Sequence, residues 1–161
     1  MKFSVKISGS TPHYDAPVVR REVTSALADI AEIGAENARQ RVLQPPKTGR
    51  IYGGKVSFAT RAGKAVSFAA KAHQASAPGE SPANWIGALV AATKSIVGAP
   101  ESLYAAFLAA KDYAVYLEKG TRKMAPRPFM RPAALAAVQK KHLLIAAAVR
   151  RGMRASKKAA K

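Results

Sequence analysis

Residues 15–43 read DAPVVRREVTSALADIAEIGAENARQRVL, and this stretch decides the fold. Its apolar residues recur at the three- and four-residue spacing of one helix face, at Val19, Val23, Leu27, Ile30 and Ile33. Asp15 is a typical helix cap, and Pro17 suits a first turn. Because Pro45 and Pro46 cannot continue a helix, the pattern predicts one long helix that ends near Leu43.

Segments of alternating apolar and polar residues lie on either side of this helix and predict strands. Upstream, the alternation runs through Phe3, Val5 and Ile7. Downstream, residues 93–99 and 103–109 have the composition of two strands joined by a turn, and a short helix is predicted before them at 88–92. Together these segments predict a small antiparallel sheet.

A second long helix is predicted to begin near Pro132 and to end near Arg151, with Gly152 as its exit. We expect its core-facing side to carry Leu135, Val138, His142, Ile145 and Val149. Residues 153–161 are expected to form a basic flexible tail. The order of elements indicates one α+β domain over residues 1–152, in which the small sheet packs against two long helices.

The segment between the first helix and the sheet contains a repeat. Val-Ser-Phe-Ala occurs at 56–59 and again at 66–69, on either side of Gly63. This pattern predicts a β-hairpin, inserted at about 47–84. An isolated hairpin should not expose this much apolar surface to water, so we expect the hairpin to protrude and to contact a neighbouring subunit through Val56, Phe58, Val66 and Phe68.

The charge of the chain is strongly positive. Of its 161 residues, 27 are Lys or Arg and 9 are Asp or Glu, giving a formal net charge of +18. Every acidic residue lies between Asp15 and Glu118. The excess favours a polyanionic neighbour, or an assembly in which partners offset the charge. Cysteine is absent, which excludes disulfides and thiolate chemistry. No stretch approaches the roughly 20 apolar residues of a membrane span.

The sequence contains no recognisable catalytic set. Residues 49–55 have the spacing of a phosphate-binding loop, but Val56 stands where that loop needs a hydroxyl group. The histidines His13, His73 and His142 fall in different predicted elements and lack metal-ligand spacing. We therefore expect no catalytic, cofactor or metal site, and we expect that the protein is not an enzyme.

Two stretches together carry a resemblance to a known family. They are HQASAPGESPANWIGAL at residues 73–89 and YAVYLEKGTRKMAPRPFMRPA at residues 113–133. They resemble the tail-completion, or head–tail joining, proteins of long-tailed bacteriophages, in the phage HK-97 "gene product ten" family. The positions that match are Tyr113, Ala114, Glu118, Gly120, Thr121, Arg127, Pro128, Phe129, Arg131, Pro132 and Ala133. The chain departs from the family at Ile86, where a hydroxyl residue is usual, and in its longer hairpin.

The resemblance implies a structural, non-catalytic protein of the virion neck, assembled in the cytoplasm of the bacterial host. Its subunits would form a homo-oligomeric ring, which we expect to be a hexamer. The ring would join the DNA-filled head to the tail, between the portal-side connector or stopper and the tail tube or terminator proteins. Basic residues would then lie near the DNA channel, where they could contact DNA non-specifically. No membrane partner is implied.

The loop of residues 118–131 is the predicted assembly site within this chain. Gly120 permits a left-handed turn, the prolines pre-order the link, and Arg127 and Arg131 flank the bulky side chain of Phe129. Glu118 is interpreted either as a helix cap or as the ion-pair partner of one of these arginines.

The sequence also offers alternatives for two bulky residues and for the function. Phe129 could anchor a neighbouring subunit or seal the core of its own domain, and both roles could hold. Trp85 is predicted to be a core or interface anchor. As an alternative function, the net charge alone favours a basic nucleic-acid-binding module.

Overall fold

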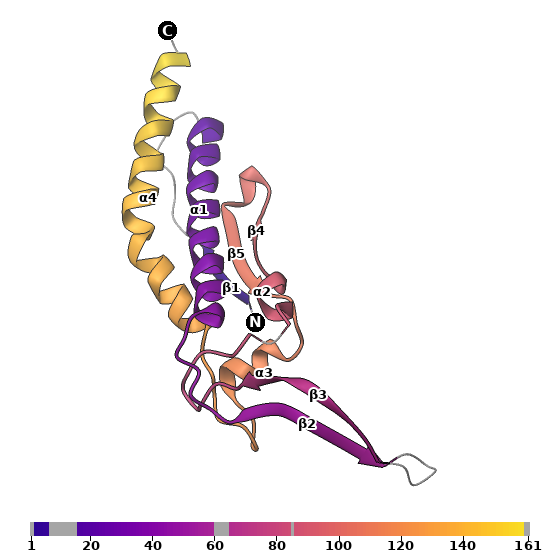
Figure 1. Ribbon diagram of the computed structural model, residues 1–161. Coiled ribbons are helices and arrows are strands. Elements are labelled where there is room, and N and C mark those ends of the chain that lie inside the picture. Colours follow the sequence, from indigo (N-terminus) through magenta and orange to yellow (C-terminus); the bar gives the residue numbers. More distant parts are fainter. Residues whose placement is uncertain (1, 7–15, 60–64, 85, 160–161) are drawn as a thin grey trace.

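The computed structural model describes residues 2–6, 16–59, 65–84 and 86–159, and it has the predicted α+β architecture (Figure 1). Ile7, His13, Asp15, Gly63 and Trp85 lie outside the described residues. The helix predicted from residues 15–43 is α1 (Ala16–Leu43). It ends two residues before Pro45, as expected from the proline stop.

The sheet has three antiparallel strands in the order β1–β5–β4. They are β1 (Lys2–Lys6), β4 (Thr93–Val97) and β5 (Tyr104–Ala109), and Phe107 of the central strand pairs with Phe3 on one side and Ser95 on the other. Helix α1 lies between this sheet and α4 (Met130–Ala159) (Figure 1). The predicted strands, the short helix α2 (Ala88–Ala92) and the two-helix arrangement are therefore confirmed.

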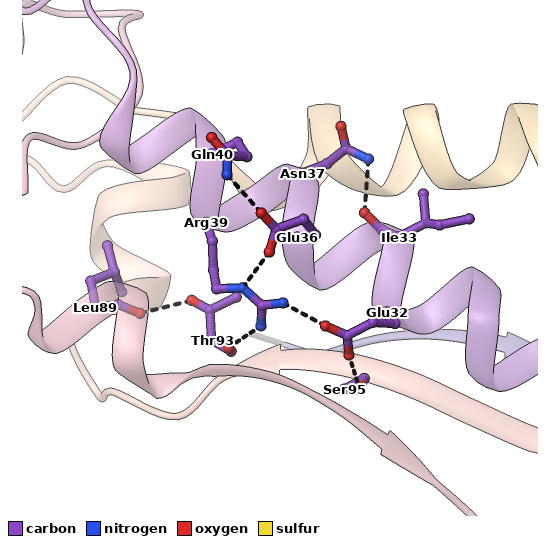
Figure 2. A network of polar contacts seen from close by, with 9 residues as sticks. All are labelled: Glu32, Ile33, Glu36, Asn37, Arg39, Gln40, Leu89, Thr93 and Ser95. Atoms are coloured by element: carbon purple, nitrogen blue, oxygen red, sulfur yellow. Dashed lines mark hydrogen bonds and ion pairs between the residues drawn. The ribbon is translucent and has the colours of Figure 1, made fainter.

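Polar contacts tie α1 to strand β4 (Figure 2). The Arg39 guanidinium donates to the carbonyl oxygen of Thr93 at 2.9 Å and also pairs with Glu32 and Glu36. The hydroxyl of Ser95 donates to the other carboxylate oxygen of Glu32. These contacts fasten α1 to the edge strand β4. The core beside them is made by Phe107 and the small residues of α1.

The close approach of the layers depends on small side chains. A Cβ at Gly34 of α1 would lie 2.5 Å from the ring of Phe107, and a Cβ at Gly152 of α4 would lie 2.8 Å from the Cα of Val19. Ala35, Ala38, Ala133 and Ala148 are completely buried. The two long helices therefore pack almost backbone to backbone, which requires glycine and alanine at the contact.

This packing corrects two predictions for α4. The helix buries Ala133, Ala137, Ala148 and Gly152, whereas Leu135 is 60% exposed and His142 is also exposed. The predicted core-facing side is thus wrong at its N-terminal half, because close packing selects small residues rather than large apolar ones. The helix also does not end at Gly152. Residues 153–159 continue it, instead of forming a tail.

The predicted hairpin is present and projects from the body of the molecule (Figure 1). It consists of β2 (Ile51–Ala59) and β3 (Ala65–Gln74), which pair with each other in a separate two-stranded sheet. The register pairs Val56 with Phe68 and Phe58 with Val66, so these positions share one face of the ribbon. We call this hairpin, residues 51–74, the arm.

A further short helix precedes α4. The apolar segment at 113–118, to which the sequence pattern assigned no element, forms α3 (Ala114–Lys119), and a 3-10 turn at Pro100–Ser102 links β4 to β5. In the part of the chain that the structure describes, no helix has both the length and the apolar character to cross a bilayer.

Candidate assembly surface at the base of the arm

The two stretches that carry the family resemblance lie against each other in the structure. The backbone N–H of Gly79 donates to the carbonyl oxygen of Pro126 at 3.0 Å, and Arg127 Nε donates to the carbonyl oxygen of Ser76 at 3.2 Å. The Ser81 hydroxyl donates to the carbonyl oxygen of Pro128. Residues about 50 positions apart in sequence are therefore joined at the base of the arm.

Glu118 is the centre of the second stretch, and it is buried, with only 7% of its surface exposed. Its Oε2 accepts hydrogen bonds from the backbone N–H groups of Phe129 at 2.8 Å and Met130 at 2.9 Å, and its Oε1 accepts from that of Arg131 at 2.8 Å. These N–H groups open α4 and have no partner within the helix. The carboxylate thus caps α4 from the last turn of α3, where negative charge is favourable.

The cap settles the two interpretations of Glu118. Among the ion pairs formed by the described residues, none involves Glu118, so the expected pairing with Arg127 or Arg131 is wrong and the helix cap is confirmed. Arg131 is exposed, while Arg127 is half-buried and donates its backbone N–H to the carbonyl oxygen of Leu117 at 2.7 Å.

Gly120 has a positive φ of 76°, as its place in the motif predicted, but its ψ of −179° is extended, so the conformation is not that of a left-handed helical turn. Its N–H donates to the carbonyl oxygen of Tyr116 and ends α3. A Cβ at this position would lie 2.7 Å from the carbonyl oxygen of Met124 and 2.9 Å from the nitrogen of Pro126. Both the backbone angle and the space therefore require glycine here.

Phe129 is completely buried within its own chain, where it packs with Val42, Leu89 and Phe107. Of its two predicted roles, the structure shows the sealing of the domain core. A second buried bulky side chain, that of Met130, follows it. The loop of residues 118–131 is thus held from inside by Glu118 and Phe129, and it presents Arg131 outward.

Glu80, in the first stretch, joins the segment just before β2 to the segment just after β3. Its carboxylate accepts hydrogen bonds from the backbone N–H groups of Thr48 at 2.9 Å and Ala77 at 2.8 Å, and from the Thr48 hydroxyl. The hydroxyl of Thr48 and then these N–H groups hold the pKa of Glu80 below its usual value. Lys47 reinforces the same junction by donating to the carbonyl oxygens of Arg41 and Ser81.

An open cleft of about 400 Å³ lies at this junction, between the base of the arm and helices α2 and α3. Tyr52, His73, Ile86, Tyr113, Leu117 and Arg127 are among the residues that line it. Ile86 is 76% exposed and Tyr52 is 52% exposed. Several large apolar side chains that share one open surface are typical of a protein contact site.

The structure brings together only part of the predicted site. Glu118, Gly120, Arg127, Phe129 and Arg131 lie at the base of the arm, whereas Val56, Phe58, Val66 and Phe68 belong to the halves of β2 and β3 that are next to the turn of the hairpin. The predicted site did not include Tyr52, Tyr113 or Ile86 of the cleft, although Tyr113 and Ile86 lie in the two stretches that carry the resemblance. Their spacing in sequence shows no common pattern, because the cleft joins residues from the base of the arm, the segment before α2 and the start of α3.

Comparison of the chain with models of protein families, with curated proteins and with solved structures gives no match. Among the described residues, no group of three or more His, Asp or Glu side chains is placed to hold a metal ion.

Proposed function

We propose that this protein is a structural subunit of the neck of a long-tailed bacteriophage. In this role it forms a homo-oligomeric ring, with six subunits expected, between the portal-side connector or stopper and the tail tube or terminator proteins. The protein contributes contacts rather than chemistry, and it becomes part of the virion after synthesis in the host cytoplasm.

The observation that carries this proposal is the pairing of a projecting arm with an apolar cleft in the same chain. Among the described residues, the two strands of the arm have no third strand beside them, so both outer edges keep unpaired backbone groups. A neighbouring chain can satisfy such edges by direct pairing. The cleft at the base of the arm adds exposed aromatic and aliphatic side chains.

The outer half of the arm and the cleft at its base are different surfaces, which supports a head-to-tail contact between copies. When the arm of one subunit binds the cleft of the next, the growing chain keeps a free arm at one end and a free cleft at the other. Such a contact closes into a ring when the rotation between neighbours divides a full circle. The resemblance of residues 73–89 and 113–133 to head–tail joining proteins supports the same arrangement, since these stretches anchor the arm.

A second candidate function is a basic nucleic-acid-binding module. It is favoured by the net charge of +18 and by the grouping of arginines at one end of the helix pair.

The experiment that tests the neck proposal removes the arm. Residues 56–69 are deleted in the phage that encodes this chain, and lysates are inspected by electron microscopy. We expect full heads and free tails that fail to join. The isolated deleted protein should keep its helical circular dichroism, because β2 and β3 pair with each other rather than with the body.

A double substitution in a different exposed place supplies the matched control. Leu143 is 75% exposed on α4, and Leu135 lies on the same helix. Their replacement by Ser should leave joining intact. Normal joining without the arm would refute the proposal, and so would loss of the fold in the isolated deleted protein.

A further inference from the structure

The first turns of α1 and the last turns of α4 lie side by side, at the end of the molecule opposite the arm (Figure 1). Gly152 of α4 sits against Val19 of α1, with only 2.8 Å between the Cα of Val19 and a Cβ placed on the glycine. One turn away, Arg151 Nε donates to Glu22 Oε2 at 2.8 Å. The two helix ends are therefore held at a fixed separation, and we call this end the tip.

The tip carries a dense group of cations. Arg20 and Arg21 project from α1, and Arg150, Arg154 and Lys157 from α4; all five are exposed. Among the ion pairs formed by described side chains, none involves any of the five, and Glu22 pairs with Arg151. The next carboxylate along α1 is that of Asp29, two helical turns further from the tip.

The tip also lacks the exposed apolar residues that are present elsewhere. In the described part of the chain, the large hydrophobic residues that are exposed on α1 and α4 are Leu43, Leu135, Val138 and Leu143. All four lie toward the arm end of the helices or near the middle of α4. The tip thus offers charge without an apolar centre, whereas protein–protein contacts are depleted of charge at their centre and enriched in aromatic residues.

We propose that the tip binds the phosphodiester backbone of nucleic acid without sequence preference. Backbone recognition depends on cations that displace condensed counterions, and it needs no apolar core. The arginine fork suits phosphate oxygens, which it can contact through two parallel hydrogen bonds. Arg150, Arg154 and Lys157 share one face of α4 and span about 10 Å along its axis, the length of about three base-pair steps.

This inference does not depend on the proposed role in ring assembly, because it rests on the helix ends and not on the arm. Its test is binding of a short fluorescein-labelled DNA duplex, measured by fluorescence anisotropy over a range of salt concentrations. The variant replaces Arg150 and Arg154 by Gln. The matched control replaces Lys94 and Lys111 by Gln; it removes the same charge from exposed positions in the sheet region.

We expect the tip variant to lose about tenfold in affinity at physiological salt, and its log–log salt slope to fall by about 2, one for each lost phosphate contact. The control should keep nearly the original slope and affinity. Both variants should melt at the wild-type temperature, because all four side chains are exposed and outside the ion pairs of the described residues.

Three results would overturn the inference. Equal losses in the tip variant and the control would mean that net charge alone governs binding. An unchanged slope in the tip variant would place the phosphate contacts elsewhere. A labelled polyglutamate peptide of the same charge as the duplex provides the third: if the tip variant loses as much affinity for the peptide as for DNA, the tip is a surface for acidic proteins.

Discussion

Replacement of Glu118 by Ala tests how the loop of residues 118–131 is held. The carboxylate accepts three backbone hydrogen bonds at 2.8–2.9 Å and is buried, so Ala removes three partners at once. Phe129 and Met130, whose N–H groups lose their acceptor, are themselves fully buried, and water cannot replace the carboxylate without entering the core.

The magnitude follows from these contacts. Loss of an ordinary helix cap costs about 0.5–2 kcal/mol, and each buried N–H left without a partner adds about 1–3 kcal/mol. Partial relaxation of the loop reduces the sum, so we expect a loss of about 2–4 kcal/mol in the free energy of unfolding. For a chain of this length that corresponds to a fall in Tm of roughly 5–15 °C. A surface ion pair in the same place would be worth at most about 1 kcal/mol.

Thermal unfolding followed by circular dichroism measures the effect. Glu118→Gln keeps the size of the side chain and one carbonyl acceptor, and it should fall between wild type and Glu118→Ala. Asp112→Ala is the matched control, because this exposed carboxylate lies just before α3 and has the same charge. A Tm for Glu118→Ala equal to that of Asp112→Ala would refute the capping argument.

Three other predictions follow from the same structure. Phe129→Ala should destabilise the isolated protein by about 3–5 kcal/mol because its ring fills the core; a nearly unchanged melt would contradict this role. The hydroxyl of Ser95 and then the Arg39 guanidinium lower the pKa of Glu32, so its contribution to stability is present above the ordinary value of 4.5 and is lost as the pH falls through the lowered value. In denaturant titrations, Glu32→Gln should therefore have a lower free energy of unfolding than wild type at neutral pH but not in strong acid. An equal difference in free energy at both pH values would refute this linkage. The purified protein should be monomeric or weakly associated in light scattering at physiological salt, because a net charge of +18 makes a free ring self-repulsive, and a stable ring without partners would contradict the prediction.

The features that could be predicted from sequence are those with a local physical signal. Helix α1 has a regular apolar spacing and a double proline at its end, and the arm has two copies of Val-Ser-Phe-Ala around a glycine. The motif predicts backbone angles at Gly120 that favour glycine, and the structure gives it a positive φ of 76°. In each case the residues that determine the structure are neighbours in the chain.

The features that escaped prediction depend on what lies across the fold. The buried face of α4 is made of alanine and glycine, and only the close approach of α1 reveals that these small residues belong to the core. Glu118 lies among basic residues in sequence, which favours an ion pair, yet in space it lies nearest to the open N–H groups of α4. The cleft, likewise, is lined by residues from separate parts of the chain, such as Tyr52, Ile86 and Tyr113.

The two proposed surfaces lie at opposite ends of the molecule, and their charges link them. Helix α4 has 30 residues and is therefore about 45 Å long, so that a partner at the cleft leaves the tip open. In a ring whose tips face one another, the repulsion between these positively charged tips would oppose assembly. A nucleic acid bound at the tips would remove that repulsion. If a polyanion binds the assembled tips more tightly than a single tip, linkage requires that it strengthens assembly by the ratio of these two affinities. DNA binding at the tips and contacts through the arms would therefore be cooperative, although the two surfaces are not in contact.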